Sequence, residues 1–128
     1  MKDFEKKVYK HLKDRDWHNL RPSDVAKSIM IEGAELLEIF QWENLSLEEI
    51  RKDKEKLEKI KGELADVLIY CFEMSVLLGL DTEKIMRKKL AYAGKKYPAK
   101  LMRVRTGEPG TESNYWRIKQ EYRSKAAK

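Results

Sequence analysis

The stretch Ile29-Met30-Ile31-Glu32-Gly33-Ala34-Glu35-Leu36-Leu37-Glu38-Ile39-Phe40-Gln41-Trp42 decides the fold expected for this chain of 128 residues. On a helical wheel drawn at about 100° per residue, Ile29, Leu36 and Ile39 fall within about 60° of Glu32. Glu35 lies about 60° to the other side of Glu32. The stretch therefore predicts an amphipathic helix with two carboxylates inside its apolar stripe. Because burying an unpaired carboxylate is costly, these two require a neutralising partner.

A second stretch, Glu63-Leu64-Ala65-Asp66-Val67-Leu68-Ile69-Tyr70, repeats the arrangement. Val67 and Tyr70 fall within about 60° of Glu63 on the wheel, and Asp66 lies about 60° to one side. If burial brings the two apolar stripes together, four carboxylates converge between the helices. Oxygen ligands of this kind suit a hard divalent ion, Mg²⁺ with Mn²⁺ as a possible substitute. The two stretches together predict a divalent-metal site.

The acidic pairs could also be surface charges or ligands of a diiron centre. A single glutamate at a core-facing position is usually a helix-end charge that reaches water. Two pairs with the same i,i+3 spacing on separate helices fit that role poorly. A diiron bundle requires Glu-x-x-His, and neither His11 nor His18 has a glutamate three residues before it.

Composition predicts one all-α domain. The chain has three prolines, six glycines and no run that alternates polar and apolar residues. No apolar run approaches the roughly 18 residues of a membrane span, and the single cysteine, Cys71, is expected to be a buried thiol in a cytoplasmic protein. A formal net charge of +6 favours an anionic partner, either nucleic acid or a nucleotide.

The order of helices follows from caps and breakers. We expect helices over residues 4 to about 17, from an N-cap at Ser23 or Asp24 to about 43, and 82 to about 96. Between them, Ser46 and Glu49 have capping-box spacing and begin one helix that runs to about residue 78. Residues 1–98 are expected to form the main domain. Residues 99–128 form a basic appendage, with a short helix over about 114–125, that docks on the core or on a second subunit.

The motif Glu32-x-x-Glu35, followed after 27 residues by Glu63-x-x-Asp66, resembles the metal-binding signature of the all-α nucleoside triphosphate pyrophosphohydrolases, the MazG-like group. The similarity is greatest to the dCTP pyrophosphatase branch and covers roughly residues 4 to 102. The stretches that carry it, besides the acidic pairs, are Arg15-Asp16-Trp17, Phe40-Gln41-Trp42, Asp66-Val67-Leu68-Ile69-Tyr70 and Lys96-Tyr97-Pro98.

This resemblance implies Mg²⁺-dependent hydrolysis of a (deoxy)nucleoside triphosphate to the monophosphate and pyrophosphate, in the service of nucleotide-pool house-cleaning. It implies a MazG-like helical bundle completed by oligomerisation to a homodimer or homotetramer. The implied metal ligands are Glu32, Glu35, Glu63 and Asp66. Glu35 is the first candidate for the catalytic base and Glu38 the second. The positions implied to bind nucleotide are Trp17, Trp42, Tyr70, Lys89 and Lys96.

Two departures from the family pattern concern base and sugar recognition. Ala93 stands where the family has an asparagine, and the linker after Trp17 is one residue shorter, so that Arg21 stands nearest to the family's base-pocket histidine. Two other functions remain open. One is a phosphoribosyl-ATP pyrophosphohydrolase built on the same acidic pattern. The other is a basic helical protein that binds nucleic acid or a protein partner, which is less favoured because four inward acids would repel phosphate without a metal.

Overall fold

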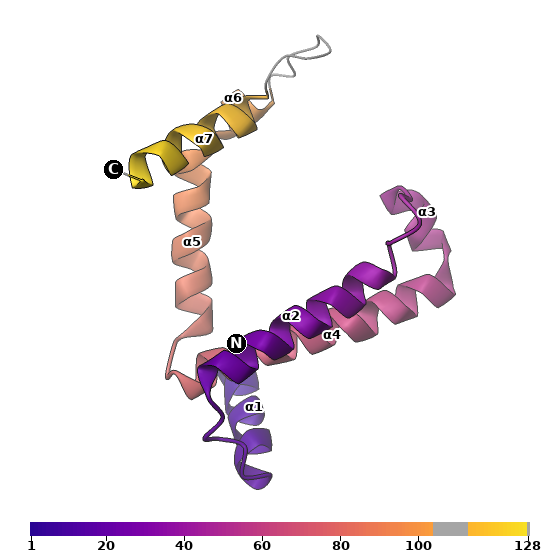
Figure 1. The fold of residues 1–128 in the computed structure, drawn as a ribbon, viewed down its shortest axis with the longest axis vertical. Helices are drawn as coiled ribbons and strands as arrows, with labels where there is room; N and C mark the ends of the chain where they lie inside the picture. Colours follow the sequence, from indigo (N-terminus) through magenta and orange to yellow (C-terminus); the bar gives the residue numbers. More distant parts are fainter. Residues whose placement is uncertain (104–112, 128) are drawn as a thin grey trace. The chain divides into compact units, whose positions relative to one another are not determined.

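The computed structural model of the protein describes residues 1–103 and 113–127, and within these ranges it contains helices and no strand. The expected all-α fold is confirmed. The helices are α1 (Lys2–Asp14), α2 (Pro22–Glu38), α3 (Leu47–Lys52), α4 (Lys54–Leu77), α5 (Thr82–Lys96), α6 (Ala99–Met102) and α7 (Asn114–Ala126) (Figure 1). The chain divides into two compact units, Met1–Thr82 and Glu83–Lys128, which are considered separately below.

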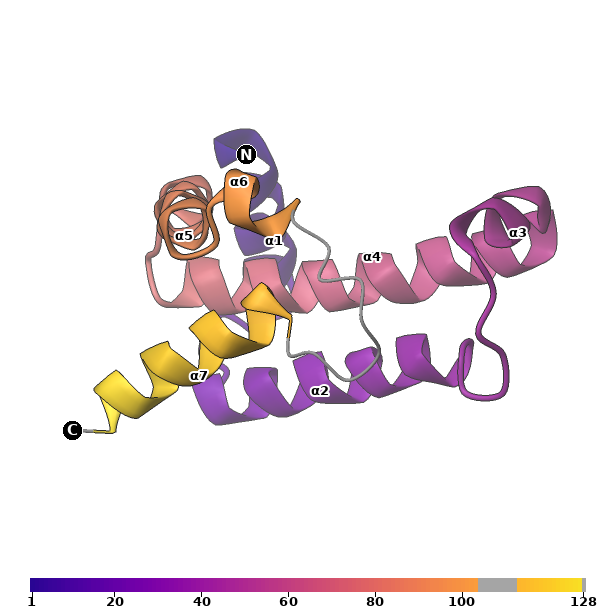
Figure 2. The ribbon, with the colours of Figure 1, turned by 90° about the horizontal axis from the view of Figure 1, so that it is seen from above.

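In the first unit, α2 and α4 lie side by side and antiparallel, and α3 connects them at one end (Figure 2). α1 packs against α4, where the rings of Phe4 and Phe72 meet edge to face with their centroids 5.1 Å apart. The buried apolar side chains of this unit are Val8, Leu12 and Val25. These residues lie on α1 and α2, two helices that pack against α4 in this unit.

The start and the end of α2 differ from the prediction. Arg21 is the N-cap residue and makes no side-chain cap, so the prediction of Ser23 or Asp24 is wrong. Pro22 explains the earlier start, because its fixed φ suits the first helical position and its missing N–H would be unpaired there in any case. The helix ends at Glu38, where i to i+3 hydrogen bonds replace the helical pattern, as in Phe40 N to Leu37 O at 2.9 Å.

The predicted capping box of α3 is confirmed. The Ser46 hydroxyl accepts from Glu49 N, and the Glu49 carboxylate accepts from Ser46 N at 2.7 Å. The expected single helix to residue 78 is wrong, because the chain breaks at Asp53, whose φ and ψ of −84° and 92° are not helical. Asp53 caps α4 by accepting a hydrogen bond from Lys56 N at 2.9 Å.

The C-terminal end of α4 is held by two kinds of contact. Gly79 has a φ of +65°, the left-handed conformation that glycine adopts without strain after a helix. Beyond this turn, Thr82 is buried, and its hydroxyl donates to the Ser75 hydroxyl at 2.7 Å. Thr82 N donates to the Glu5 carboxylate at 2.9 Å, which ties α1 to the end of α4.

The second unit is built on aromatic contacts. The rings of Tyr97 and Tyr115 stack with their centroids 4.9 Å apart, and the Asn114 side chain donates to Leu101 O at 3.1 Å. Ile118 of α7 is buried. The short helix expected near residues 114–125 is confirmed as α7. The expected boundary between residues 98 and 99 stays a prediction, and the loop between α6 and α7, residues 104–112, lies outside the described residues.

Several apolar side chains of the first unit are exposed. They include Met30 and Leu37 of α2, which are 72% and 66% exposed, and Leu68 of α4. Cys71 is exposed as well, so the expectation of a buried thiol is wrong. It fails because α1 and α2 cover only part of the surface of α4. No helix among the described residues has the length and apolar character needed to cross a membrane.

Candidate metal and nucleotide site

Three of the four predicted metal ligands come together on the antiparallel pair α2 and α4. Glu32 lies on α2, and Glu63 and Asp66 lie one turn apart on α4. One carboxylate oxygen of each residue lies within 4.8 Å of the corresponding oxygen of the other two. The wheel placed these acids on facing stripes, and the packing of α2 along α4 brings them to the same level.

Glu35 lies beside this group but is not one of the three residues whose carboxylate oxygens all lie within 4.8 Å of one another. It hydrogen-bonds to the Glu63 carboxyl group, and its charge acts on both Glu32 and Glu63. Glu38 acts on Glu63 through its charge alone. The roles of Glu35 as ligand or base, and of Glu38 as base, therefore stay predictions.

The cluster is electrostatically unfavourable without a cation. The pKa of Glu32 is raised by partial burial first, and then by the nearby charges of Glu35, Asp66 and Glu63. Burial likewise raises the pKa of Glu63, followed by the charges of Glu35 and Asp66. Both shifts have the sign expected when like charges share a site. A bound cation would reverse them.

The carboxylates are less buried than the sequence predicted. Glu32 and Glu63 are half-buried, whereas Glu35 and Asp66 are exposed. The expectation of a dry interior is wrong within the first unit, because nothing in that unit covers this side of α2 and α4. The residues nevertheless fit a hard divalent ion, since they offer only oxygen ligands. Mg²⁺ accepts a few carboxylates and retains waters, so that a half-open site suits it.

Two of the predicted nucleotide-binding residues line a hollow of about 230 Å³. Its lining residues are Trp17, Leu20, Ser28, Tyr70 and Glu73. Trp17 comes from the linker between α1 and α2, and Tyr70 lies one turn beyond Asp66 on α4. Glu73 was missed in the sequence. The signal was present, because Glu73 lies two turns after Asp66 and within about 20° of it on the wheel.

The other three predicted residues lie elsewhere. Trp42 follows the end of α2 and is 87% exposed. Lys89 and Lys96 belong to the second unit, where Lys89 Nζ lies 5.2 Å from the centre of the Tyr92 ring and Lys96 Nζ 4.7 Å from that of Tyr122. Their roles toward a nucleotide stay predictions.

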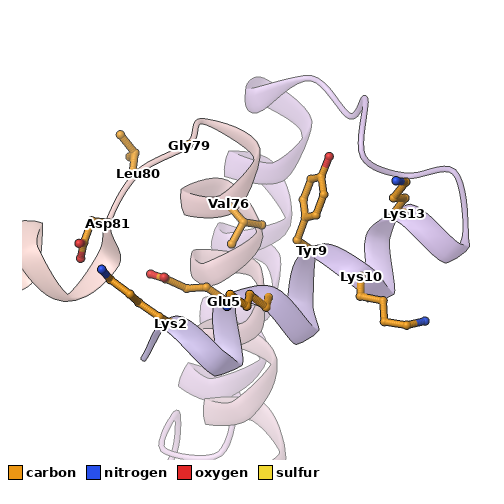
Figure 3. Close-up of a pocket in the computed structure, with 10 residues that line it drawn as sticks. Lys2, Glu5, Tyr9, Lys10, Lys13, Val76, Gly79, Leu80 and Asp81 are labelled. Carbon is orange, nitrogen blue, oxygen red and sulfur yellow. The ribbon is translucent and has the colours of Figure 1, made fainter.

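A larger hollow of about 600 Å³ lies between α1 and the C-terminal end of α4 (Figure 3). It is open and basic, with Lys2, Lys6, Lys10 and Lys13 on its α1 side and Gly79 on the other. None of the acidic or aromatic residues predicted from the sequence lines it. The volume of a hollow therefore does not identify the candidate site. The residue types that line it do.

Comparison with known proteins agrees with this geometry. The MazG-like family profile matches residues 27–103, which include all four acidic positions. The crystal structure of a pyrophosphatase from Archaeoglobus fulgidus is similar, with 33% sequence identity, a TM-score of 0.66, and coverage of 77% of this chain and 92% of that one. No curated protein matches the sequence. The extent of the family match, together with the identity to the archaeal structure, shows that this chain belongs to the MazG-like family.

Proposed function

We propose that this protein is a Mg²⁺-dependent nucleotide pyrophosphohydrolase, which cleaves a nucleoside triphosphate into the monophosphate and pyrophosphate. The observation that carries the proposal is the convergence of Glu32, Glu63 and Asp66 within 4.8 Å, beside a hollow lined by Trp17 and Tyr70. Membership of the MazG-like family and the similarity to an archaeal pyrophosphatase support it.

The antiparallel packing of α2 and α4 indicates how a nucleotide would be oriented along the two helices. On α4, Tyr70 and Glu73 follow Asp66 by one and two turns, and on α2, Ser28 precedes Glu32 by one turn. Because the helices are antiparallel, these residues lie toward the same end of the pair. Seven residues of helix, from Asp66 to Glu73, span about 10 Å, comparable to the reach from the phosphates of a nucleotide to its base. The phosphates would lie at the carboxylates and the base in the hollow.

The reaction needs charge neutralisation and a proton acceptor. When bound, Mg²⁺ neutralises the phosphates, polarises them and acidifies a bound water. Glu32, Glu63 and Asp66 would hold the ion, with Glu35 as a fourth ligand or as the base that takes the proton from the attacking water. Glu38 is the second candidate for the base. The bond that breaks joins the α-phosphorus to the bridging oxygen, and the water oxygen ends on the monophosphate.

The nucleotide would be held by the aromatic and basic residues. Trp17 offers an indole face for stacking on a base, and the Tyr70 hydroxyl can hydrogen-bond to a sugar. Trp42, Lys89 and Lys96 are proposed to complete the site, with the lysines serving the phosphates. A dCTP-like or modified nucleotide is the first candidate substrate, and phosphoribosyl-ATP is the alternative.

We propose further that the chain works as a homodimer or homotetramer. Exposed apolar side chains on α2 and α4, among them Met30, Leu37 and Leu68, are suited to burial against a second copy. Trp42, which is 87% exposed, would be covered in such an assembly. Size-exclusion chromatography coupled to light scattering tests this, and a fully active monomer would contradict it.

The decisive experiment measures pyrophosphate release. The purified protein is incubated with Mg²⁺ and each of a panel of canonical, modified and phosphoribosyl nucleotides. Asp66→Asn should abolish turnover and leave the circular dichroism spectrum of the helices unchanged. Glu58→Gln is the matched control, because Glu58 is an exposed acid on the same helix that pairs with Lys61. Full activity of Asp66→Asn would reject the assignment of the site.

A further inference from the structure

The last helix, α7, takes no part in the proposed hydrolysis. It lies outside residues 27–103, which match the family profile. It carries four basic residues and one acid, and three of its thirteen residues are aromatic. The two faces of this helix differ in what they contact.

One face of α7 packs within the second unit. Ile118 is buried, and the Tyr115 ring stacks on the Tyr97 ring with the centroids 4.9 Å apart. The Tyr122 ring meets the Tyr92 ring edge to face at 6.3 Å. On a helical wheel, the three α7 residues fall within about 60° of one another. This apolar face therefore holds α7 on α5 and on the residues that follow α5.

The opposite face of α7 is basic and carries one exposed aromatic ring. Trp116 is 50% exposed and lies about 160° from Ile118 on the wheel. Lys119 and Arg123 fall within about 60° of Trp116 and form a stripe with it at i, i+3, i+7 spacing. Lys119 Nζ lies 4.9 Å from the centre of the Trp116 ring, so that a cation and an indole stand next to each other on this face.

The second unit does not neutralise the charges of this stripe. Among its described residues, the acids are Glu83 and Glu121. Each pairs with an arginine one turn away on its own helix, at 2.6 Å for Glu83 and 3.1 Å for Glu121. Within the described part of this unit, Lys119 and Arg123 therefore pair with no carboxylate. The stripe is suited to an anionic partner from outside the unit.

The exposed indole decides between the anionic partners that a basic face could meet. A helix that binds a membrane surface inserts its apolar face, and the apolar face of α7 is already packed on α5. An acidic protein segment would use the two cations and leave the indole without a role. A single-stranded polynucleotide uses both, because its phosphates pair with cations and its unpaired bases stack on aromatic rings.

We propose that Trp116, Lys119 and Arg123 form a binding surface for single-stranded nucleic acid. A base stacks on the Trp116 indole, and the neighbouring phosphates lie at Lys119 and Arg123. The seven residues from Trp116 to Arg123 span about 10 Å of helix, which is long enough to contact more than one nucleotide. Because every base has a ring face to stack, this binding has little sequence preference. It is separate from the hydrolysis and requires no Mg²⁺.

Fluorescence anisotropy with the whole chain and labelled oligo(dT) or oligo(rU) tests the proposal. EDTA is present throughout, so that hydrolysis does not contribute to the signal. The wild type should bind at low salt with a Kd below about 10⁻⁴ M, and more tightly than it binds a duplex of equal length. Trp116→Ala should weaken the binding of single strands at least about fivefold, whereas Trp116→Phe, which keeps a ring, should stay within about twofold of the wild type.

Salt dependence tests the two cations. Each cation that meets a phosphate of a single strand adds about 0.7 to the slope of log affinity against log salt concentration. Replacing both residues, Lys119→Gln with Arg123→Gln, should therefore lower that slope by about 1.4. Lys125→Gln is the matched control, because Lys125 lies on the same helix about 180° from Trp116 and should leave the slope unchanged.

Several results would overturn the proposal. One is that the wild type binds neither oligonucleotide at low salt, and another is that Trp116→Ala binds as tightly as the wild type. Poly-glutamate that competes as well as oligo(dT) would show that the stripe recognises charge alone. Binding to phosphatidylserine vesicles without binding to oligonucleotides would assign the stripe to a membrane. Loss of the oligomer in Trp116→Ala with unchanged oligonucleotide binding would assign it to a subunit contact.

Pyrophosphate release separates this inference from the proposed function. Release from free nucleotides should be the same in the wild type and in all the variants of α7, because none of the changed residues belongs to the proposed hydrolytic site. If the wild type releases no pyrophosphate and still binds single strands through Trp116, the proposed function fails and this inference stands.

Discussion

Removing one carboxylate from the cluster should make the metal-free protein more stable and remove its response to Mg²⁺. Glu63→Gln is the sharpest such change, because Glu63 lies within 4.8 Å of Glu32 and Asp66 and hydrogen-bonds to Glu35. Glutamine keeps the shape of the side chain and removes one negative charge. The raised pKa of Glu63 indicates that its charge is unfavourable when no ion is present.

The magnitude of the response follows from linkage. Mg²⁺ at one hundred times its Kd stabilises the folded state by about 2.7 kcal/mol. An unfolding entropy of about 2.1 cal/mol/K per residue over 128 residues converts this to a rise in Tm of roughly 10 °C. Glu63→Gln should show a higher Tm than the wild type without metal and a rise of less than about 2 °C with Mg²⁺.

Differential scanning calorimetry across a Mg²⁺ titration checks this, with Glu58→Gln as the control that should behave as the wild type does.

The pH dependence of the Tm supplies a second check. Because the pKa values of Glu32 and Glu63 are raised on folding, the folded state binds more protons at these two groups, and together they should lower the stability of the metal-free wild type, relative to Glu63→Gln, as pH rises above about 4.5. Saturating Mg²⁺ should abolish that loss. A wild-type Tm that ignores Mg²⁺ at neutral pH, or a Glu63→Gln variant that responds fully, would refute the shared-ion site.

Three further changes test other parts of the structure. Ser46→Ala removes the capping box of α3 and should cost about 1 kcal/mol, a fall in Tm of roughly 4 °C by calorimetry, whereas an unchanged Tm would mean that the cap contributes nothing. Gly79→Ala meets no atom within 4 Å but must adopt a φ of +65°, so denaturant unfolding should show a loss of about 1 kcal/mol from backbone strain alone. Trp17→Ala should raise KM for the preferred nucleotide at least about tenfold and leave the Mg²⁺-induced rise in Tm unchanged; equal loss of both would make Trp17 a structural residue and not a stacking platform.

The acidic pairs could be read from the sequence because helical periodicity is local. Two acids three residues apart keep the same relation on any straight helix, so the wheel alone places Glu32 and Glu63 on apolar stripes. The position of α2 along the axis of α4 depends on tertiary packing, which the helical wheel does not show. It gathers Glu32, Glu63 and Asp66 closely and leaves Glu35 beside them.

Burial was the least predictable property. A helical wheel shows which face is apolar and not what covers that face. Cys71 and Leu68 lie in an apolar helix and are exposed, because α1 and α2 cover only part of α4 within the first unit. The break at Asp53 was hidden for a different reason. The lysines and glutamates around it favour helix on both sides, and an aspartate serves equally well inside a solvated helix or as an N-cap.

The positive and negative residues of the chain are divided unequally between its two units. Residues 1–82 carry 14 lysines and arginines against 18 aspartates and glutamates, whereas residues 83–128 carry 14 against 4. The net charge of +6 therefore arises entirely in the second unit, and the unit that holds the carboxylates is itself negative. A triphosphate would be repelled there unless a divalent ion neutralised it, and in the proposed oligomer a second copy of the chain would supply further cations. We therefore expect substrate affinity to fall with dilution below the dissociation constant of the oligomer, and Lys96→Ala to raise KM without changing the Mg²⁺-induced rise in Tm. Affinity that is independent of protein concentration would mean that one chain supplies all the charges its substrate needs.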